Sequence, residues 1–216
     1  MTGGIALSIT VTYQPLPAAK HIRLSAENIT ELVGAALAGE ERAWNALVAE
    51  FGSMIWAVAR AHRLRDADAS EVSQATWLRL LEHLGKLTDP TRVGAWLATT
   101  ARRECLRVLR ESQRCGLYGD DAPERVSPEM APDDVALLRD RDDALWRSFS
   151  SLRASDQALL RLLLADPRPS YEEIAAALDM PIGSIGPTRQ RALERLRREL
   201  RREGTLGLLI DCWRWR

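Results

Sequence analysis

The segment 170–200 constrains the fold of this chain more than any other stretch. It predicts a helix, a tight turn over 179–183 and a second, strongly basic helix. Ser170 followed by Glu173 has the pattern of a capping box, in which the two side chains satisfy free backbone N–H groups at a helix start. The residues that follow place an apolar face at helical spacing, made of Tyr171, Ile174, Ala175 and Leu178.

The second helix of this pair is strongly basic. From Ser184 to Arg202 it has seven arginines against two glutamates. We expect Ser184 to cap it, and Pro187 is compatible with its first turn because N–H groups there have no helical partner. A short helix followed by an arginine-rich one is typical of a helix-turn-helix that enters the DNA major groove, although such helices can also be solvated faces. The candidate DNA contacts are Ser184, Gly186, Pro187, Thr188, Arg189, Gln190, Arg191 and Arg195.

Charge is segregated along the chain, although the formal net charge is zero. Residues 98–114 have a net charge of +3 and residues 184–202 a net charge of +5, whereas residues 119–143 between them carry −6. Two basic segments separated by an acidic one suggest two nucleic-acid contacts and a connector that avoids phosphate. Neutrality of the whole chain therefore does not argue against DNA binding.

Helical periodicity predicts an all-α protein of two small domains. We expect a flexible N-terminal tail (1–27), a four-helix domain (28–114), an acidic proline-containing linker (115–133), a helix-turn-helix domain (134–203) and an apolar C-terminal tail (204–216). The C-terminal tail could pack on a domain or bind a regulator. No stretch alternates with period two for long enough to predict a sheet.

Nothing in the sequence indicates a catalytic, metal or cofactor site. The three cysteines and three histidines do not have the spacing of a metal cluster. Cys105 and Cys115 could form a redox switch, but two incidental thiols explain them as well. The odd, scattered set of cysteines suggests a reduced cytoplasmic protein. No apolar run approaches the roughly 20 residues that span a bilayer, so we expect no membrane insertion.

Together these motifs resemble the extracytoplasmic-function sigma factors of the sigma-70 family. The second domain has Ser170-Tyr171, Glu173-Ile174-Ala175 and Gly183-Ser184-Ile185 where the family has S-Y-x-E-I-A and G-[ST]-[VI]. In the first domain, segment 71–77 (EVSQATW) and segment 96–102 (WLATTAR) resemble its D-x-x-Q-x-x-[FW] and W-L-x-x-x-A-R helices. Arg103 replaces the usual asparagine, and Gly186-Pro187 stand where the family often recognises DNA, so promoter preference does not transfer.

The resemblance implies an initiation factor for RNA polymerase. Its second domain would recognise the −35 element, and its first would recognise and melt the −10 element through a pocket in loop 85–93 and a basic track of Thr99, Arg102, Arg103, Arg107 and Arg110. Core polymerase would be bound through Glu71, Gln74, Trp77, Leu78 and Leu81. The implied partners are the clamp helices of the largest polymerase subunit, the flap of the second-largest, promoter DNA and an anti-sigma factor.

Two other functions fit parts of the sequence. A stand-alone helix-turn-helix regulator with a sensing or dimerising N-terminal domain would bind duplex DNA without polymerase. An adaptor that sequesters other transcription proteins would show no salt-sensitive DNA binding. The helix around Gln74 and Trp77 argues against the simple regulator, and the basic helix 93–112 argues against the adaptor.

Overall fold

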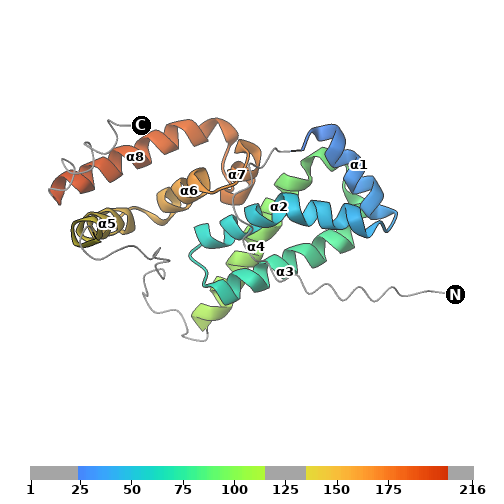
Figure 1. The fold of residues 1–216 in the computed structure, drawn as a ribbon, viewed down its shortest axis with the longest axis horizontal. Coiled ribbons are helices and arrows are strands. Elements are labelled where there is room, and N and C mark those ends of the chain that lie inside the picture. The colour runs from blue at the N-terminus through green and yellow to red at the C-terminus, as the bar shows by residue number, and fades with distance from the viewer. Residues whose placement is uncertain (1–23, 115–134, 204–216) are drawn as a thin grey trace.

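The structure, a computed structural model, is all-α in the part of the chain that it describes. This part comprises residues 24–114 and 135–203, with side chains of the first helical turns after residue 134 described from Asp143 onward. The predicted linker and both predicted tails therefore lie almost entirely outside it. Eight α-helices are present in these ranges (Figure 1): α1 Ala26–Leu37, α2 Glu41–Ala61, α3 Asp66–His83, α4 Val93–Arg114, α5 Val135–Ser150, α6 Ala154–Leu164, α7 Tyr171–Leu178 and α8 Ile185–Arg202.

Short 3-10 turns join several of these helices. Two of them, η1 (Leu84–Lys86) and η2 (Pro90–Arg92), lie between α3 and α4 in and next to loop 85–93, and η3 (Ile182–Ser184) leads into α8. The Asp89 carboxylate accepts a hydrogen bond from the Thr91 N–H at 3.0 Å and so holds η2 in place. None of the described helices is long and apolar enough to span a bilayer.

The capping box predicted at the start of α7 is confirmed. The Ser170 hydroxyl accepts a hydrogen bond from the Glu173 N–H at 3.2 Å, and the Glu173 carboxylate accepts one from the Ser170 N–H at 2.7 Å. Asp179 ends α7 in the left-handed region with φ of 55°, where a short polar side chain is tolerated. This turn sets the angle between α7 and η3.

The predicted cap at the start of α8 is wrong. Ser184 is the last residue of η3 and has a helical conformation. Its hydroxyl donates a hydrogen bond to the Pro181 carbonyl at 2.6 Å instead of accepting one from a backbone N–H of α8. The reason is that the chain enters α8 directly from a 3-10 turn, so no extended residue precedes the helix. Pro187 lies in the first turn of α8, as predicted.

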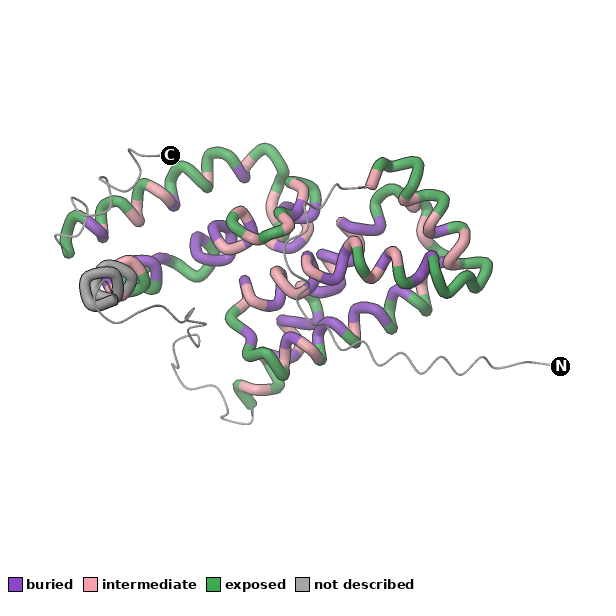
Figure 2. Tube along the Cα trace, viewed as in Figure 1, coloured by how far each residue is buried: buried purple, intermediate pink, exposed green. Residues whose placement is uncertain are grey.

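Helix α2 is the centre of the first helical unit. Its buried side chains include Leu47, Phe51, Ile55 and Val58, and they contact α1, α3 and α4. Helix α3 packs on α4, and Trp77 of α3 lies edge-to-face on Trp44 of α2 with ring centroids 6.0 Å apart. This arrangement buries one face of each helix against α2 (Figure 2).

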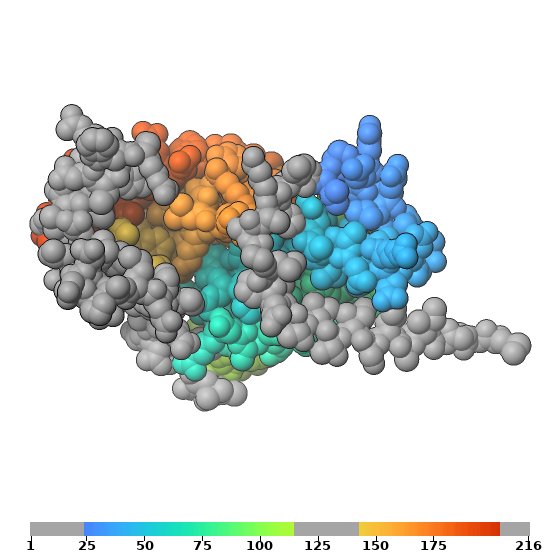
Figure 3. Space-filling view, in the orientation of Figure 1, coloured from blue at the N-terminus to red at the C-terminus, as the bar shows by residue number. Residues whose placement is uncertain are grey.

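Part of the second helical unit (α5–α8) joins the apolar core of the first (α1–α4), which the sequence did not predict, while Phe149, Leu152, Leu160 and Ala192 form a second, separate cluster. Buried residues of α6, α7 and α8, among them Leu159, Ile174 and Ile185, belong to the same cluster as Leu47 and Leu97 of the first unit. Helix α7 lies on α4, and α6 contacts α2. In the space-filling view the orange second unit directly adjoins the blue-green first unit (Figure 3).

The close approach of α7 to α4 depends on Gly94. A Cβ atom at this position would lie 2.4 Å from Oε1 of Glu173 and 2.9 Å from Cε1 of Phe51. Both neighbours are buried, and the Glu173 carboxylate is held by the capping box, so neither can move away freely. Gly94 thus allows α2, α4 and the start of α7 to meet.

We predict that Ser170→Ala lowers the free energy of unfolding by about 1 kcal/mol, the typical cost of removing an N-cap hydroxyl. Thermal and urea unfolding followed by circular dichroism would measure this. Ser184→Ala is the matched control, because its hydroxyl does not cap α8, and we expect a much smaller change. Equal losses in the two variants would contradict the assignment of the caps.

Candidate nucleic-acid and polymerase interfaces

Helix α8 presents one buried face and one exposed, basic face. Ile185, Ala192 and Leu200 are buried, whereas Gly186, Pro187, Arg189, Gln190 and Arg191 are exposed. Thr188 is half-buried on the same first turns. Because arginine donates to guanine O6 and N7 and glutamine suits adenine N6 and N7, this face can contact base edges.

Two arginines of α8 differ in how freely they can meet DNA. Among the described residues, Arg191 bonds within its own helix, to the Pro187 carbonyl and the Thr188 hydroxyl, both at 3.3 Å. Arg195 instead forms an ion pair with Asp156 of α6, whose side chain is buried. If Arg195 moved away to contact DNA, Asp156 would be left as an uncompensated buried charge. Arg195 therefore has a structural role in this conformation.

Ion pairs separate the arginines of the predicted basic track on α4 into two groups: Arg102 and Arg107 are paired with carboxylates, and Arg103 is not paired in the described chain. Arg102 contacts Asp179 at the end of α7 at 3.0 Å. Arg107 contacts three carboxylates at 2.8–2.9 Å, those of Glu104, Glu71 and Glu111. The hydrogen bonds that the Arg107 guanidinium donates to these carboxylates raise the pKa of Arg107 above its usual range. Arg103, in contrast, is exposed and has no ion pair within the described chain.

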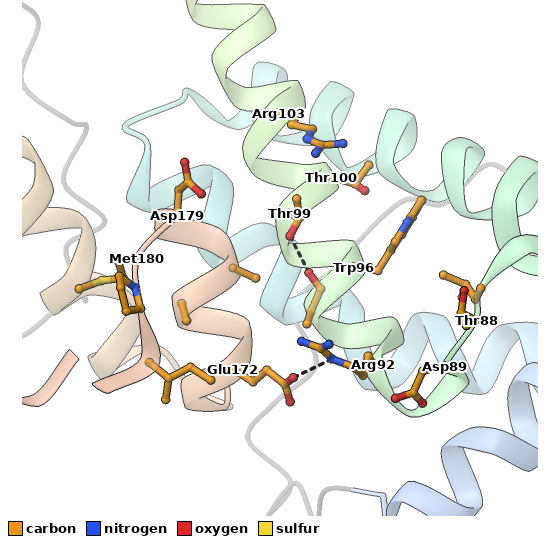
Figure 4. Close-up of a pocket in the computed structure, with 16 residues that line it drawn as sticks. Thr88, Asp89, Arg92, Trp96, Thr99, Thr100, Arg103, Glu172, Asp179 and Met180 are labelled. Carbon is orange, nitrogen blue, oxygen red and sulfur yellow. Dashed lines mark hydrogen bonds and ion pairs between the residues drawn. The ribbon is translucent and has the colours of Figure 1, made fainter. Parts of the chain in front are cut away.

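The remaining residues of this track bond to their own helix. Arg110 donates to the Leu106 carbonyl at 2.9 Å, and the Thr99 hydroxyl donates to the Ala95 carbonyl at 3.0 Å. Thr99, Arg103 and Trp96 line a hollow of about 810 Å³ between α4 and the α7–η3 segment. Figure 4 shows Trp96 and Arg103 on the α4 side of this hollow and Met180 and Asp179 opposite them.

A buried carboxylate organises the contact between α3 and α4, and the sequence did not single it out. Glu104 is only 4% exposed and bonds to Arg107 and Arg79. Burial alone would raise its pKa, but the hydrogen bonds and charges of the two arginines keep the pKa below its ordinary value. The i,i+3 spacing of Glu104 and Arg107 on α4 is visible in the sequence. The contact with Arg79 is not, because Arg79 lies on α3.

The exposed face of α3 carries apolar side chains at helical spacing. Leu78 is 62% and Leu81 is 49% exposed, and Gln74 and Glu71 continue the same face. Exposed leucines in such a stripe are typical of a protein-binding surface. Glu71 also reaches Arg107 at 2.9 Å, which joins this face to α4.

Trp77 is not part of that exposed face, which corrects the prediction that it contacts polymerase. Its side chain is 4% exposed and packs on Trp44 in the core. The sequence predicted that Val72, Ala75 and Leu78 form the buried stripe of α3 and that Trp77 lies outside it. In the structure the buried face of α3 is wide enough to include Trp77, and Leu78 is exposed instead. A substitution of Trp77 would therefore perturb the fold and could not isolate a polymerase contact.

We searched the residues that the structure describes for candidate metal ligands and for free thiols. No group of three or more His, Cys, Asp or Glu residues there could hold a metal ion. Cys105 is buried, and burial raises the pKa of its thiol to about 12, so it does not form the reactive thiolate at neutral pH. Cys115 lies outside the described residues.

The fold combines a helical unit that carries a basic helix with a helix-turn-helix unit whose basic second helix is exposed. This combination is typical of DNA-binding transcription proteins. Comparison with known proteins agrees. Residues 47–115 match the family Sigma-70 region 2. An ECF RNA polymerase sigma factor, RpoE of Cereibacter sphaeroides, is 28% identical over 139 residues, which cover 61% of this chain and 70% of that protein.

A solved structure shows the same fold. CnrH, determined in complex with the cytosolic domain of CnrY, superposes with a TM-score of 0.53 and 21% identity over 87% of this chain and 99% of that one. Over residues 47–115 the chain thus matches Sigma-70 region 2, and over a longer stretch it is similar to an RNA polymerase sigma factor of the ECF type.

A half-buried histidine lies where the two helical units meet. His62, at the end of α2, is near the Ala177 backbone of α7 and Arg102 of α4. Burial, and to a smaller extent the charge of Arg102, lower the pKa of His62, while the Ala177 backbone partly opposes the shift. Its Nε2 atom is buried without a hydrogen bond of normal geometry in the described chain.

We predict that His62 makes the protein less stable in mild acid. The unfolded chain takes up this proton near pH 6.5, whereas the folded protein takes it up only at lower pH. Stability from neutral His62 is thus complete above about pH 6.5 and is lost as the pH falls toward the lowered pKa. The slope is at most about 1.4 kcal/mol per pH unit, that of one proton.

Urea unfolding between pH 5 and 7 would measure this dependence. His62→Gln should remove that part of the slope, while the control His83→Gln should keep it. An unchanged slope in His62→Gln would show that another group is responsible.

Proposed function

We propose that this protein is a sigma factor that docks on core RNA polymerase through α3 and directs it to a promoter with two elements. In this proposal residues 134–203 form the region that recognises the −35 element, and residues 28–114 form the region that binds polymerase and recognises and melts the −10 element. The acidic segment 115–133 is the connector. The proposal rests on the family and on the three separate surfaces described above.

The exposed basic face of α8 is the single observation that carries the DNA part of the proposal. A helix-turn-helix places the start of its second helix in the major groove, and here that start is exposed over Gly186–Arg191. Arg189, Gln190 and Arg191 would contact bases or flanking phosphates. Ser184 would contact DNA through its backbone near the helix start, because its hydroxyl already donates a hydrogen bond to the Pro181 carbonyl.

The −10 element would meet the α4 surface next to loop 85–93. A groove for unstacked bases needs a basic backbone track and an aromatic or apolar wall. Arg103 and Arg110 provide exposed charge, Thr99 a hydroxyl, and Trp96 a half-buried ring. Arg102 and Arg107 would join this track only by leaving or sharing their carboxylate partners.

The exposed apolar stripe of α3 suits the clamp helices of the largest polymerase subunit. Leu78 and Leu81 would supply apolar area, and Gln74 and Glu71 polar contacts at the edge. The second unit would contact the flap of the second-largest subunit. An anti-sigma factor is a further expected partner, and the related fold of CnrH was solved with the cytosolic domain of CnrY bound.

We predict that Leu78→Ala/Leu81→Ala lowers the affinity for core polymerase at least tenfold and leaves DNA binding intact. Truncating two exposed anchors at a protein interface typically has an effect of this size. Fluorescence anisotropy of the labelled protein with purified core polymerase would measure it. Leu37→Ala, another exposed leucine on α1, is the matched control. Equal affinity of the double variant and the control would contradict the polymerase site.

We predict that Arg191→Ala lowers promoter selectivity while core binding is unchanged. Loss of a bidentate contact to a base costs about 1–3 kcal/mol, or roughly 5- to 150-fold in discrimination. Run-off transcription with core polymerase on a library of genomic fragments would first define the promoter and then compare the variants. Arg201→Ala, at the far end of α8, is the control.

The same experiment separates the proposed function from its alternative. A stand-alone regulator would bind duplex sites without polymerase and would support no transcripts when core polymerase is added. Specific duplex binding together with a lack of specific transcripts would therefore favour the regulator and overturn the proposal.

A further inference from the structure

We propose that the hollow between α4 and the α7–η3 segment is a binding site for a small planar aromatic molecule that carries a single carboxylate. The inference goes beyond the proposed function, because the binding itself requires neither polymerase nor DNA. The size of the hollow, its aromatic and apolar lining and the charge of Arg103 carry the argument.

The hollow has the size of an ordinary small-molecule site. Its volume of about 810 Å³ lies within the range of roughly 300–1,000 Å³ that is typical of ligand pockets. Residues of α4 line its middle, segment 87–89 lines one side and the α7–η3 segment lines the other (Figure 4). Three segments that are distant in the sequence thus converge on one space, and a single bound molecule can contact all of them.

Trp96 offers an aromatic surface to such a molecule. Its side chain lines the hollow and is half-buried, as is that of Met180 on the other side. The Trp96 ring packs against His83 of α3, which does not line the hollow, with ring centroids 6.0 Å apart. Ile182, which also lines the hollow, is 51% exposed. Because aromatic rings pack well on aromatic and thioether side chains, a planar ring suits the space between Trp96 and Met180.

The charges of the lining favour an anion at Arg103. Two of the lining carboxylates are already paired with arginines: Glu172 with Arg92 at 2.9 Å, and Asp179 with Arg102 at 3.0 Å. Arg103 is exposed and has no ion pair within the described chain. Its planar guanidinium can therefore donate two parallel hydrogen bonds to the carboxylate of a ligand.

Asp89 limits the ligand to one anionic group. Its carboxylate accepts hydrogen bonds from the N–H and the hydroxyl of Thr91, neither of which neutralises it. Figure 4 shows Asp89 and Arg103 at opposite ends of the hollow. A second carboxylate on the ligand would be repelled by Asp89, so the end of the molecule that points away from Arg103 has to be neutral.

Such a ligand would give a small molecule direct access to the surface assigned above to the −10 element. Trp96, Thr99 and Arg103 line the hollow and also belong to that surface. A molecule bound there and the promoter strand would compete for the same side chains. This regulatory consequence, unlike the binding itself, rests on the proposed function.

Isothermal titration calorimetry with the full chain would measure the affinity for 2-naphthoate and for the neutral 2-naphthamide. The two probes share one ring system and differ in charge. We expect the carboxylate to bind about tenfold more tightly, the low end for a hydrogen bond between charged groups. The diacid 2,6-naphthalenedicarboxylate should bind more weakly than 2-naphthoate, because its second carboxylate would face Asp89.

Two variants and one control locate the site. Arg103→Gln removes the charge and should abolish the preference for the carboxylate over the amide. Trp96→Leu keeps an apolar side chain but removes the ring, and it should weaken both probes by a similar factor. The matched control is Arg114→Gln, an exposed arginine of α4 that does not line the hollow, and it should keep the preference of the unmodified protein. Circular dichroism would verify that each variant remains folded.

The inference is overturned if 2-naphthoate does not bind, if it binds no more tightly than the amide, or if Arg103→Gln retains the preference. Run-off transcription in the presence of 2-naphthoate tests the consequence separately, and we expect fewer transcripts. A bound probe that leaves transcription unchanged would overturn the competition with promoter DNA. A lack of specific transcripts even without the probe would overturn the proposed function, and the calorimetric result would stand on its own.

Discussion

The packing of α7 on α4 at Gly94 is the contact on which the rest of the structure depends. Because no side chain separates the helices there, Glu173 and Phe51 both pack against Gly94, and buried residues of α6, α7 and α8 join the core of the first unit. The same contact brings His62 and Arg102 beneath α7 and pairs Arg92 with Glu172. A single small residue thus determines how the two helical units lie relative to each other.

Carboxylates decide which of the many arginines are available to a ligand. Arg107 is surrounded by three glutamates, Arg195 is held by a buried aspartate, and Arg102 is paired across the contact between the units. Arg103 and Arg189 have no such partner in the described chain. A basic helix is therefore a weaker indicator of DNA contact than its arginine count suggests, because an arginine that neutralises a buried acid cannot be withdrawn cheaply.

Helix positions were largely predictable because helical periodicity and caps are local signals. The capping box at Ser170 and the turn before Pro187 needed only neighbouring residues to be recognised. Ser184 was misassigned because the cap depends on the conformation of the preceding turn. Trp77 was misassigned because the width of a buried helix face depends on the helices that cover it, here α2 with Trp44.

The sequence by itself determined the helices, the helix-turn-helix and the segregation of charge, and it carried the motifs of the sigma-70 family, since all of these are properties of short segments. Only the tertiary structure decided that the two helical units share a core, that Leu78 and Leu81 are the exposed anchors of α3, and which arginines are paired. These features arise between residues distant in the chain, such as Gly94 and Glu173 or Arg195 and Asp156. Their contacts follow from how the helices pack, and no local pattern specifies that packing.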